Sequence, residues 1–120
     1  MANVLVVDDE EDIVSFLAYE LSSQGYTVFT ANDGVEAVLK MADLNVDVLL
    51  MDIRMPKLDG LNALRIIRRF KPDVPVIMFS GSASNNEMIM STRLGAYSCL
   101  LKPVYMDYLF RTLKDLFIHQ

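Results

Sequence analysis

The sequence predicts an α/β fold, in which a doubly wound, five-stranded parallel sheet carries helices on both faces. Three observations support this prediction. Five short apolar segments alternate along the chain with segments of helical periodicity. The apolar segments at 46–51 and 74–79 are almost continuously hydrophobic, which is typical of central parallel strands covered on both sides. Polar residues follow several of these segments directly, which suits a sheet whose strands all end at one functional edge.

The predicted strands are apolar or β-branched segments bounded by turn residues. They span residues 3–7, 26–31, 46–51, 74–79 and 97–101. The segment at 46–51 is central to the prediction, because it runs directly into Asp52 and an ionised side chain cannot remain unpaired inside a sheet. Asp52 is therefore expected at the carboxyl end of its strand. Met55, Pro56, Asp59 and Gly60 then predict a shaped loop, in which glycine permits a positive φ.

Helical periodicity predicts five helices between and after these strands. Their approximate ranges are 11–24, 33–42, 61–70, 84–94 and 106–117. Gly25 ends the first, and Asn32 or Asp33 caps the second. The fourth has the weakest stripe, because Met88, Ile89 and Met90 are consecutive, and its exposed apolar surface is a candidate for function.

Length and charge restrict the classes of function. The 120 residues, 52% of them hydrophobic, fit one domain spanning 1–120 with a sizeable core. A net charge of −5 argues against direct binding of nucleic acid or of anionic membranes. No apolar run approaches the roughly 18 residues of a spanning helix, and residues 8–11 are acidic, which excludes a signal-peptide pattern. A cytoplasmic location is expected, and Cys99, the only cysteine, has no partner for an internal disulfide.

Five polar side chains should converge at the carboxyl edge of the predicted sheet. They are Asp8 and Asp9 after the first strand, Asp52 after the third, Ser80 after the fourth and Lys102 after the fifth. Two carboxylates about 4 Å apart repel by roughly 4 kcal/mol at an effective dielectric near 20, so three require a cation or raised pKa values. A hard ion such as Mg²⁺ suits such oxygen ligands and leaves positions for water and phosphate oxygens.

Each of these residues also has an ordinary interpretation when it is taken singly. Asp8, Asp9 or Glu10 would cap the following helix, Ser80 would be a turn residue, and Lys102 would be solvated. Their joint placement at successive strand ends favours a functional site instead.

The chain resembles the receiver domain of two-component response regulators over essentially its whole length. The residues that carry the resemblance are Asp8, Asp9 and Glu10, then Asp52 with Met55, Pro56, Asp59 and Gly60, then Ser80, and finally Lys102 with Pro103. The resemblance implies a flavodoxin-like sheet with strand order 2-1-3-4-5 and a single receiver domain at 1–120.

The resemblance also implies a role for each site residue. Asp52 would be the phosphoacceptor, Ser80 would hydrogen-bond the phosphoryl group, and Lys102 would pair with it. The divalent ion, Mg²⁺ or Mn²⁺, would be held directly by Asp9, Asp52 and the backbone carbonyl of Arg54, and partly through water by Asp8.

The function implied is that of a signalling switch rather than of a turnover enzyme. Such a domain takes a phosphoryl group from a histidine kinase or a histidine phosphotransfer protein and assists its own phosphorylation and dephosphorylation. Phosphorylation would alter a surface formed by the helix at 84–94, the strand at 97–101 and the helix at 106–117. That surface would bind a downstream target, an output domain or a second copy of the chain.

Three other functions share part of this pattern. A flavodoxin-like electron carrier should have a loop rich in glycine and hydroxyls after the first strand, whereas this loop is acidic. A Mg²⁺-dependent phosphohydrolase with an aspartyl nucleophile normally has a second acid two residues later, where this chain has Arg54. An unphosphorylated interaction module of the same fold is disfavoured by the intact acceptor, metal and lysine positions.

Two features of this chain bear on how it would switch. Most receivers have Tyr or Phe three residues before the final lysine, and this chain has Cys99. Tyr97 is the candidate replacement, because alternate strand residues share a face, although it is equally consistent with a loop residue. Arg54 and Ser82 match positions that flank the phosphoryl group in the family, and we expect Arg54 to slow its hydrolysis.

Overall fold

The computed structural model describes residues 2–81 and 85–118. Within these ranges the chain forms a five-stranded parallel sheet in the order β2-β1-β3-β4-β5, which confirms the predicted fold class and strand order. The strands are β1 (Asn3–Val7), β2 (Thr27–Ala31), β3 (Val48–Asp52), β4 (Val76–Ser80) and β5 (Ser98–Leu101).

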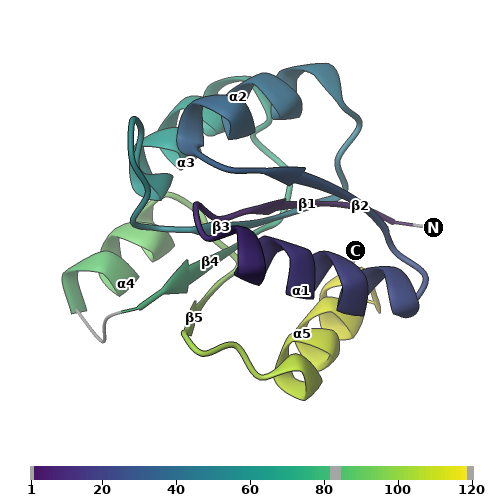
Figure 1. Ribbon diagram of the computed structural model, residues 1–120. Helices are drawn as coiled ribbons and strands as arrows, with labels where there is room; N and C mark the ends of the chain where they lie inside the picture. Colours follow the sequence, from purple (N-terminus) through teal and green to yellow (C-terminus); the bar gives the residue numbers. More distant parts are fainter. Residues whose placement is uncertain (1, 82–84, 119–120) are drawn as a thin grey trace.

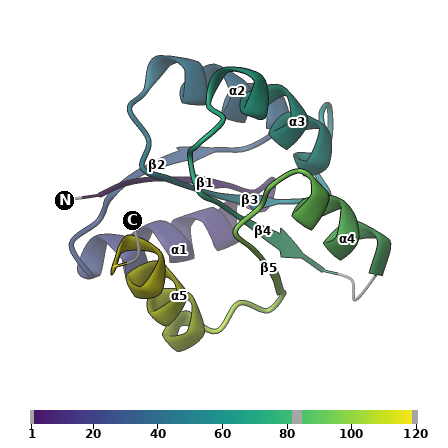
Figure 2. The same cartoon turned by 180° about the vertical axis from the view of Figure 1, so that it is seen from behind.

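Helices lie on both sides of this sheet. They are α1 (Glu11–Ser23), α2 (Gly34–Asp43), α3 (Gly60–Phe70), α4 (Asn85–Arg93) and α5 (Met106–Ile118). Figure 1 shows α2 and α3 above the sheet and α1 and α5 below it, and Figure 2 shows the same layers from behind. None of the helices in the described ranges is long and apolar enough to cross a membrane.

Each face of the sheet has its own hydrophobic core, because successive strand residues point to opposite faces. Leu49 and Met51 of β3 face α2 and α3, whereas Val48 and Leu50 face α1 and α5. All five residues of β3 are buried, as the apolar composition predicts for a central strand. Full burial of one such side chain stabilises the fold by about 1.5–3 kcal/mol, so β3 contributes strongly to both cores.

The helix ends follow the local sequence. Gly25, with φ of 96°, ends α1 where predicted, and the Asp33 carboxylate caps α2 by accepting a 2.8 Å hydrogen bond from the Glu36 amide. Asp59 caps α3 in the same way through the Asn62 amide, also at 2.8 Å. Both caps place a negative charge at the positive end of a helix dipole.

Four strands begin later than the apolar pattern predicts, and β2 starts at Thr27 rather than at residue 26. β3 starts at Val48 rather than at residue 46, and β5 starts at Ser98 rather than at residue 97. β4 starts at Val76 rather than at residue 74, where Pro75 interrupts the amide donors that a strand supplies to its neighbours. At their carboxyl ends β3 and β4 each extend one residue further than predicted, so that Asp52 and Ser80 are their last residues.

The loop after β3 explains why a glycine stands at residue 60, although not by the conformation expected. Lys57, with φ of 69°, is the residue in the left-handed region, and Gly60 is not. A Cβ atom on Gly60 would lie 2.1 Å from the Asp52 carbonyl oxygen, and the Gly60 amide donates to the Ile53 carbonyl at 2.6 Å. Gly60 is therefore needed because α3 begins directly against the end of β3.

Candidate functional site

The functional site is formed where four strands end. Asp8 follows β1, Asp52 ends β3, Ser80 ends β4, and Lys102 follows β5. Parallel pairing aligns these ends, and the Lys102 amide extends the alignment by donating to the Ser80 carbonyl at 2.8 Å. Residues separated by more than 90 positions in the sequence thus meet at one edge of the sheet.

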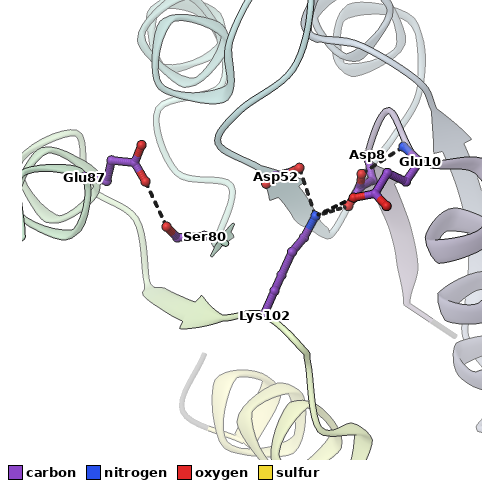
Figure 3. Close-up of polar contacts among 6 residues, drawn as sticks. All are labelled: Asp8, Glu10, Asp52, Ser80, Glu87 and Lys102. Carbon is purple, nitrogen blue, oxygen red and sulfur yellow. Dashed lines mark hydrogen bonds and ion pairs between the residues drawn. The ribbon is translucent and has the colours of Figure 1, made fainter. Parts of the chain in front are cut away.

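Lys102 joins the acidic residues of this edge. Its Nζ atom lies 2.7 Å from Asp8 Oδ2 and 2.9 Å from Asp52 Oδ2, and 3.8 Å from Glu10 Oε1 (Figure 3). Asp8 is fully buried and Asp52 is 5% exposed, so neither carboxylate can rely on water for its charge. Buried charges of this kind require a partner, and the ammonium group serves both.

Burial and pairing act in opposite directions on the pKa values here. Burial raises the pKa of Asp52 despite the favourable charge of Lys102, and the nearby Asp8 raises it further. For Lys102, burial alone would lower the pKa, but hydrogen bonds and attraction from Asp8 and Asp52 outweigh it and raise the pKa. The positive charge of Lys102 is therefore favoured, whereas burial and the charge of Asp8 make ionisation of Asp52 less favourable.

The carboxylates fit a divalent metal ion by their chemistry. Asp8, Asp9 and Asp52 each offer an oxygen, and these oxygens lie within 4.8 Å of one another. The second oxygen of Asp8 accepts a 3.0 Å hydrogen bond from the Glu10 amide, which holds that side chain in place. Asp9 is exposed, so the cluster is open to solvent on one side. A hard ion prefers such a set of oxygens, with waters in the remaining positions.

Ser80 lies at the same edge, but its hydroxyl is directed elsewhere. It donates a 2.8 Å hydrogen bond to Glu87 Oε1 on α4, and Figure 3 shows it pointing toward Glu87 rather than toward Asp52. Arg54, two residues after Asp52, donates from Nε to the other oxygen, Glu87 Oε2, also at 2.8 Å. Ser82, the other flanking position, lies outside the described residues.

Glu87 was missed by the sequence analysis. It is the one acidic residue in the segment 84–94, and it falls in the first turn of the predicted helix. The available signal was a lone acid only seven residues after Ser80, which was itself a predicted site residue. Its partners became identifiable only when α4 was placed beside the ends of β3 and β4.

Cys99 lies on β5, which is an edge strand of the sheet. Cys99 is half-buried, and burial raises the pKa of its thiol, so it remains protonated. Cys99 lines a hollow of about 290 Å³, together with residues that include Met88, Leu101, Tyr105 and Tyr108. Tyr97 is not among the residues that border this hollow. It is half exposed and immediately precedes β5, although its amide already donates to the Val76 carbonyl of β4 at 2.7 Å.

Comparison with known proteins finds similar proteins over nearly the whole chain. Residues 4–114 match the family model of the response regulator receiver domain. The transcriptional regulatory protein GlrR of Escherichia coli K12 is 33% identical over 114 residues, which are 95% of this chain and 26% of that protein. The chain thus spans about a quarter of the first curated relatives that it matches.

Solved structures show the same fold. Chemotaxis protein CheY4 of Vibrio cholerae superposes with a TM-score of 0.90 at 32% identity, covering 96% of this chain and 98% of CheY4. Response regulator TrrA of Thermotoga maritima, solved in complex with Mg²⁺ and a beryllium fluoride, gives 0.88 at 34% identity and covers 97% and 99%. The strand order and the pairing of Lys102 with Asp8 and Asp52 agree with these matches. Together they show that the chain belongs to the response regulator receiver domain family.

Proposed function

We propose that this domain is a phosphorylation switch in which Asp52 accepts a phosphoryl group from a histidine kinase or a histidine phosphotransfer protein. Residues 1–120 act in it as one receiver domain with a cytoplasmic location. The observation that carries the proposal is the Lys102 ammonium, held between Asp8 and Asp52 at 2.7 and 2.9 Å. An ordinary structural ion pair needs one carboxylate, whereas this arrangement keeps a nucleophile and a cation together at an open edge.

In the transfer step, a carboxylate oxygen of Asp52 attacks the phosphorus atom. The bond from phosphorus to the donor histidine nitrogen breaks, the nitrogen keeps the electron pair, and an acyl phosphate forms on Asp52. Lys102 then pairs with a phosphoryl oxygen, and the Ser80 hydroxyl donates to another. Water later attacks the phosphorus, the bond from phosphorus to the Asp52 oxygen breaks, and inorganic phosphate leaves while Asp52 regains its carboxylate.

Asp8, Asp9, Asp52 and the Arg54 carbonyl would hold Mg²⁺ or Mn²⁺. The bound ion would supply neutralising charge for the carboxylates and for the phosphoryl oxygens. The chain's own groups position the reactants, because Lys102 restrains Asp52 and the Glu10 amide restrains Asp8. The domain thereby assists its own phosphorylation and dephosphorylation without turning over a separate substrate.

The switch surface comprises α4, β5 and α5. It carries exposed apolar side chains, among them Ile89, Leu101, Tyr105 and Tyr108, together with the hollow beside Cys99. Phosphorylation alters this surface for a downstream protein, for an output domain of the same polypeptide or for a second receiver. With its net charge of −5, this domain itself is expected to bind neither nucleic acid nor anionic membranes directly.

The test is intact mass spectrometry after incubation with acetyl phosphate and Mg²⁺. The wild-type protein should gain the mass of one phosphoryl group, and Asp52→Asn should gain none, because an amide oxygen is a poor nucleophile. Asp59→Asn is the matched control, since it alters a carboxylate of the same loop whose capping role asparagine can retain. Phosphorylation of Asp52→Asn at the wild-type rate would refute the assignment.

A further inference from the structure

We infer that Glu87 is a positioning residue that occupies, in the unphosphorylated domain, two of the groups that a phosphoryl group on Asp52 requires. This inference rests on the proposed function and adds a competitor to it. Glu87 accepts from the Ser80 hydroxyl with one oxygen and from the Arg54 guanidinium with the other, each at 2.8 Å. Its carboxylate is therefore an internal stand-in for phosphoryl oxygens.

The burial of these groups makes the contacts more than incidental surface pairs. The Glu87 side chain is 14% exposed and Ser80 is 1% exposed, whereas the Arg54 side chain is 73% exposed. A mostly buried carboxylate needs hydrogen-bond partners, and Ser80 and Arg54 are the ones it has within the described residues. Arg54 can leave at low cost because water can replace its partner, while Ser80 and Glu87 are less accessible to water.

Phosphorylation of Asp52 would change which acceptor these donors prefer. An acyl phosphate carries more negative charge than a carboxylate and has more acceptor oxygens, so it competes for both the hydroxyl and the guanidinium. When Ser80 turns toward Asp52, Glu87 loses its 2.8 Å donor and faces a new anion as well. Both effects disfavour the present position of Glu87 and, through it, of the first turn of α4.

The other end of α4 has a separate anchor. Arg68 of α3 donates to the carbonyl of Leu94 at 3.3 Å and to that of Gly95 at 2.8 Å, directly after α4. The same guanidinium donates to the carbonyls of Val74 at 2.6 Å and Lys71 at 3.2 Å. None of these acceptors belongs to the phosphorylation site. Loss of the Glu87 contacts would thus free the amino end of α4 while Arg68 holds its carboxyl end.

The decisive measurement is the affinity for beryllofluoride, a phosphoryl mimic, in the presence of Mg²⁺ by calorimetric titration. Glu87→Ala should bind it about threefold to tenfold more tightly than wild type, because no contact must first be broken. Glu87→Gln should fall between the two, since its carboxamide oxygen still accepts from Ser80 but carries no charge. Asp107→Ala, which removes an acid from the first turn of α5 instead, should match wild type.

A merely structural role for Glu87 predicts a different pattern. It would lower the melting temperature without tightening beryllofluoride binding, and its effect would not depend on Ser80 or Arg54. In the Ser80→Ala, Arg54→Ala background, adding Glu87→Ala should therefore lose most of its gain in affinity. Equal or weaker binding by Glu87→Ala, or an undiminished gain in that background, would overturn the inference.

A second measurement needs neither metal nor mimic. In hydrogen exchange of the free protein, the amides of Ile89 and Met90 should exchange faster in Glu87→Ala than in wild type, while that of Ala96 should be unchanged. Unaltered exchange at Ile89 and Met90 would show that Glu87 is no tether. Failure of the proposed function looks different, because then wild type itself binds no beryllofluoride or Asp52→Asn still binds it.

Discussion

Charge balance around Lys102 is the physical reason for proposing a metal ion at this site. One ammonium faces the carboxylates of Asp8 and Asp52, and the exposed carboxylate of Asp9 lies in the same cluster. The three acids therefore exceed the lysine charge by two. An incoming phosphoryl group would add further negative charge, and a divalent cation would make its approach favourable.

Asp9 should control metal binding without controlling the fold, because it is exposed whereas Asp8 and Asp52 are buried. Mg²⁺ at 100 times its dissociation constant should stabilise wild type by about 2.7 kcal/mol, seen as a rise in melting temperature. We expect Asp9→Ala to lose most of this rise. Asp12→Ala, an exposed acid in the first turn of α1, is the control and should keep it. An equal Mg²⁺-dependent rise in Asp9→Ala would rule out the metal assignment.

Arg54 should lengthen the lifetime of the phosphorylated state. Its guanidinium is exposed at the rim of the site and is held by Glu87 at 2.8 Å, from which it can turn to cover the phosphoryl group. Radiolabel decay should be faster in Arg54→Ala by roughly the tenfold that about 1.4 kcal/mol represents. Lys57→Ala removes a cation of the same loop that pairs with Asp33, and should decay as wild type does. Slower decay in Arg54→Ala would contradict this role.

At the scale of single elements, N-caps and a close strand-to-helix contact determine where the helices next to the site begin. Asp59 caps α3, and Gly60 lets that helix begin against Asp52. Asp33 caps α2, and Lys57 of the loop after β3 pairs with it at 3.4 Å. The loop that carries Arg54 is thus connected to the starts of two helices.

The Asp33 cap should make stability depend on pH. The hydrogen bond from the Glu36 amide lowers the pKa of Asp33, and Lys57 adds to this effect. A carboxyl whose pKa is lowered on folding stabilises the protein above its usual titration range, and this stabilisation is lost as the pH falls through the folded pKa. Urea unfolding of Asp33→Ala should show a loss of about 1 kcal/mol at neutral pH that shrinks in acid.

Asp33→Asn separates the cap from its charge. Asparagine caps about as well as aspartate, so this variant should retain most of the stability at neutral pH while lacking the titration. A loss in Asp33→Ala that is the same in acid as at neutral pH would show that ionisation of Asp33 contributes nothing.

For the molecule as a whole, a change at Asp52 must reach the proposed switch surface through residues that connect the two. Cys99 is too small to transmit the rotation of a ring, and the hollow beside it is bordered by Tyr105 and Tyr108 rather than by Tyr97. The backbone of Tyr97 is nevertheless tied to β4, because its amide donates to the Val76 carbonyl at 2.7 Å. Tyr97 therefore remains a candidate relay from just outside the strand.

If Tyr97 relays the switch, Tyr97→Ala should be phosphorylated on Asp52 as wild type is but should lose phosphorylation-dependent self-association or target binding. Mass spectrometry and analytical ultracentrifugation on the same samples measure both properties. Tyr19→Ala, an exposed tyrosine of α1, controls for loss of an aromatic side chain. An undiminished response in Tyr97→Ala would leave α4, with Met88 to Met90 and the Glu87 contacts, as the route.

The sequence by itself determined the layers of the fold and the edge at which the site lies. Apolar runs such as 46–51 can be buried only as strands or helices, and the charge of Asp52 ends such a run. Alternation with amphipathic segments then requires parallel strands whose ends align, which predicts that Asp8, Ser80 and Lys102 lie near Asp52. The starts of β3 and β4 were predicted less well, each by two residues, because backbone pairing depends on the neighbouring strand as well as on composition.

Only the tertiary structure decided which of these side chains face one another. Periodicity places Ser80 at the edge but does not say that its hydroxyl points to Glu87, since that contact requires α4 to lie beside the ends of β3 and β4. The absence of Tyr97 from the hollow beside Cys99 is of the same kind. Such contacts join residues on different elements, and they depend on how the elements pack and on which rotamers that packing permits, which no local pattern in the chain encodes.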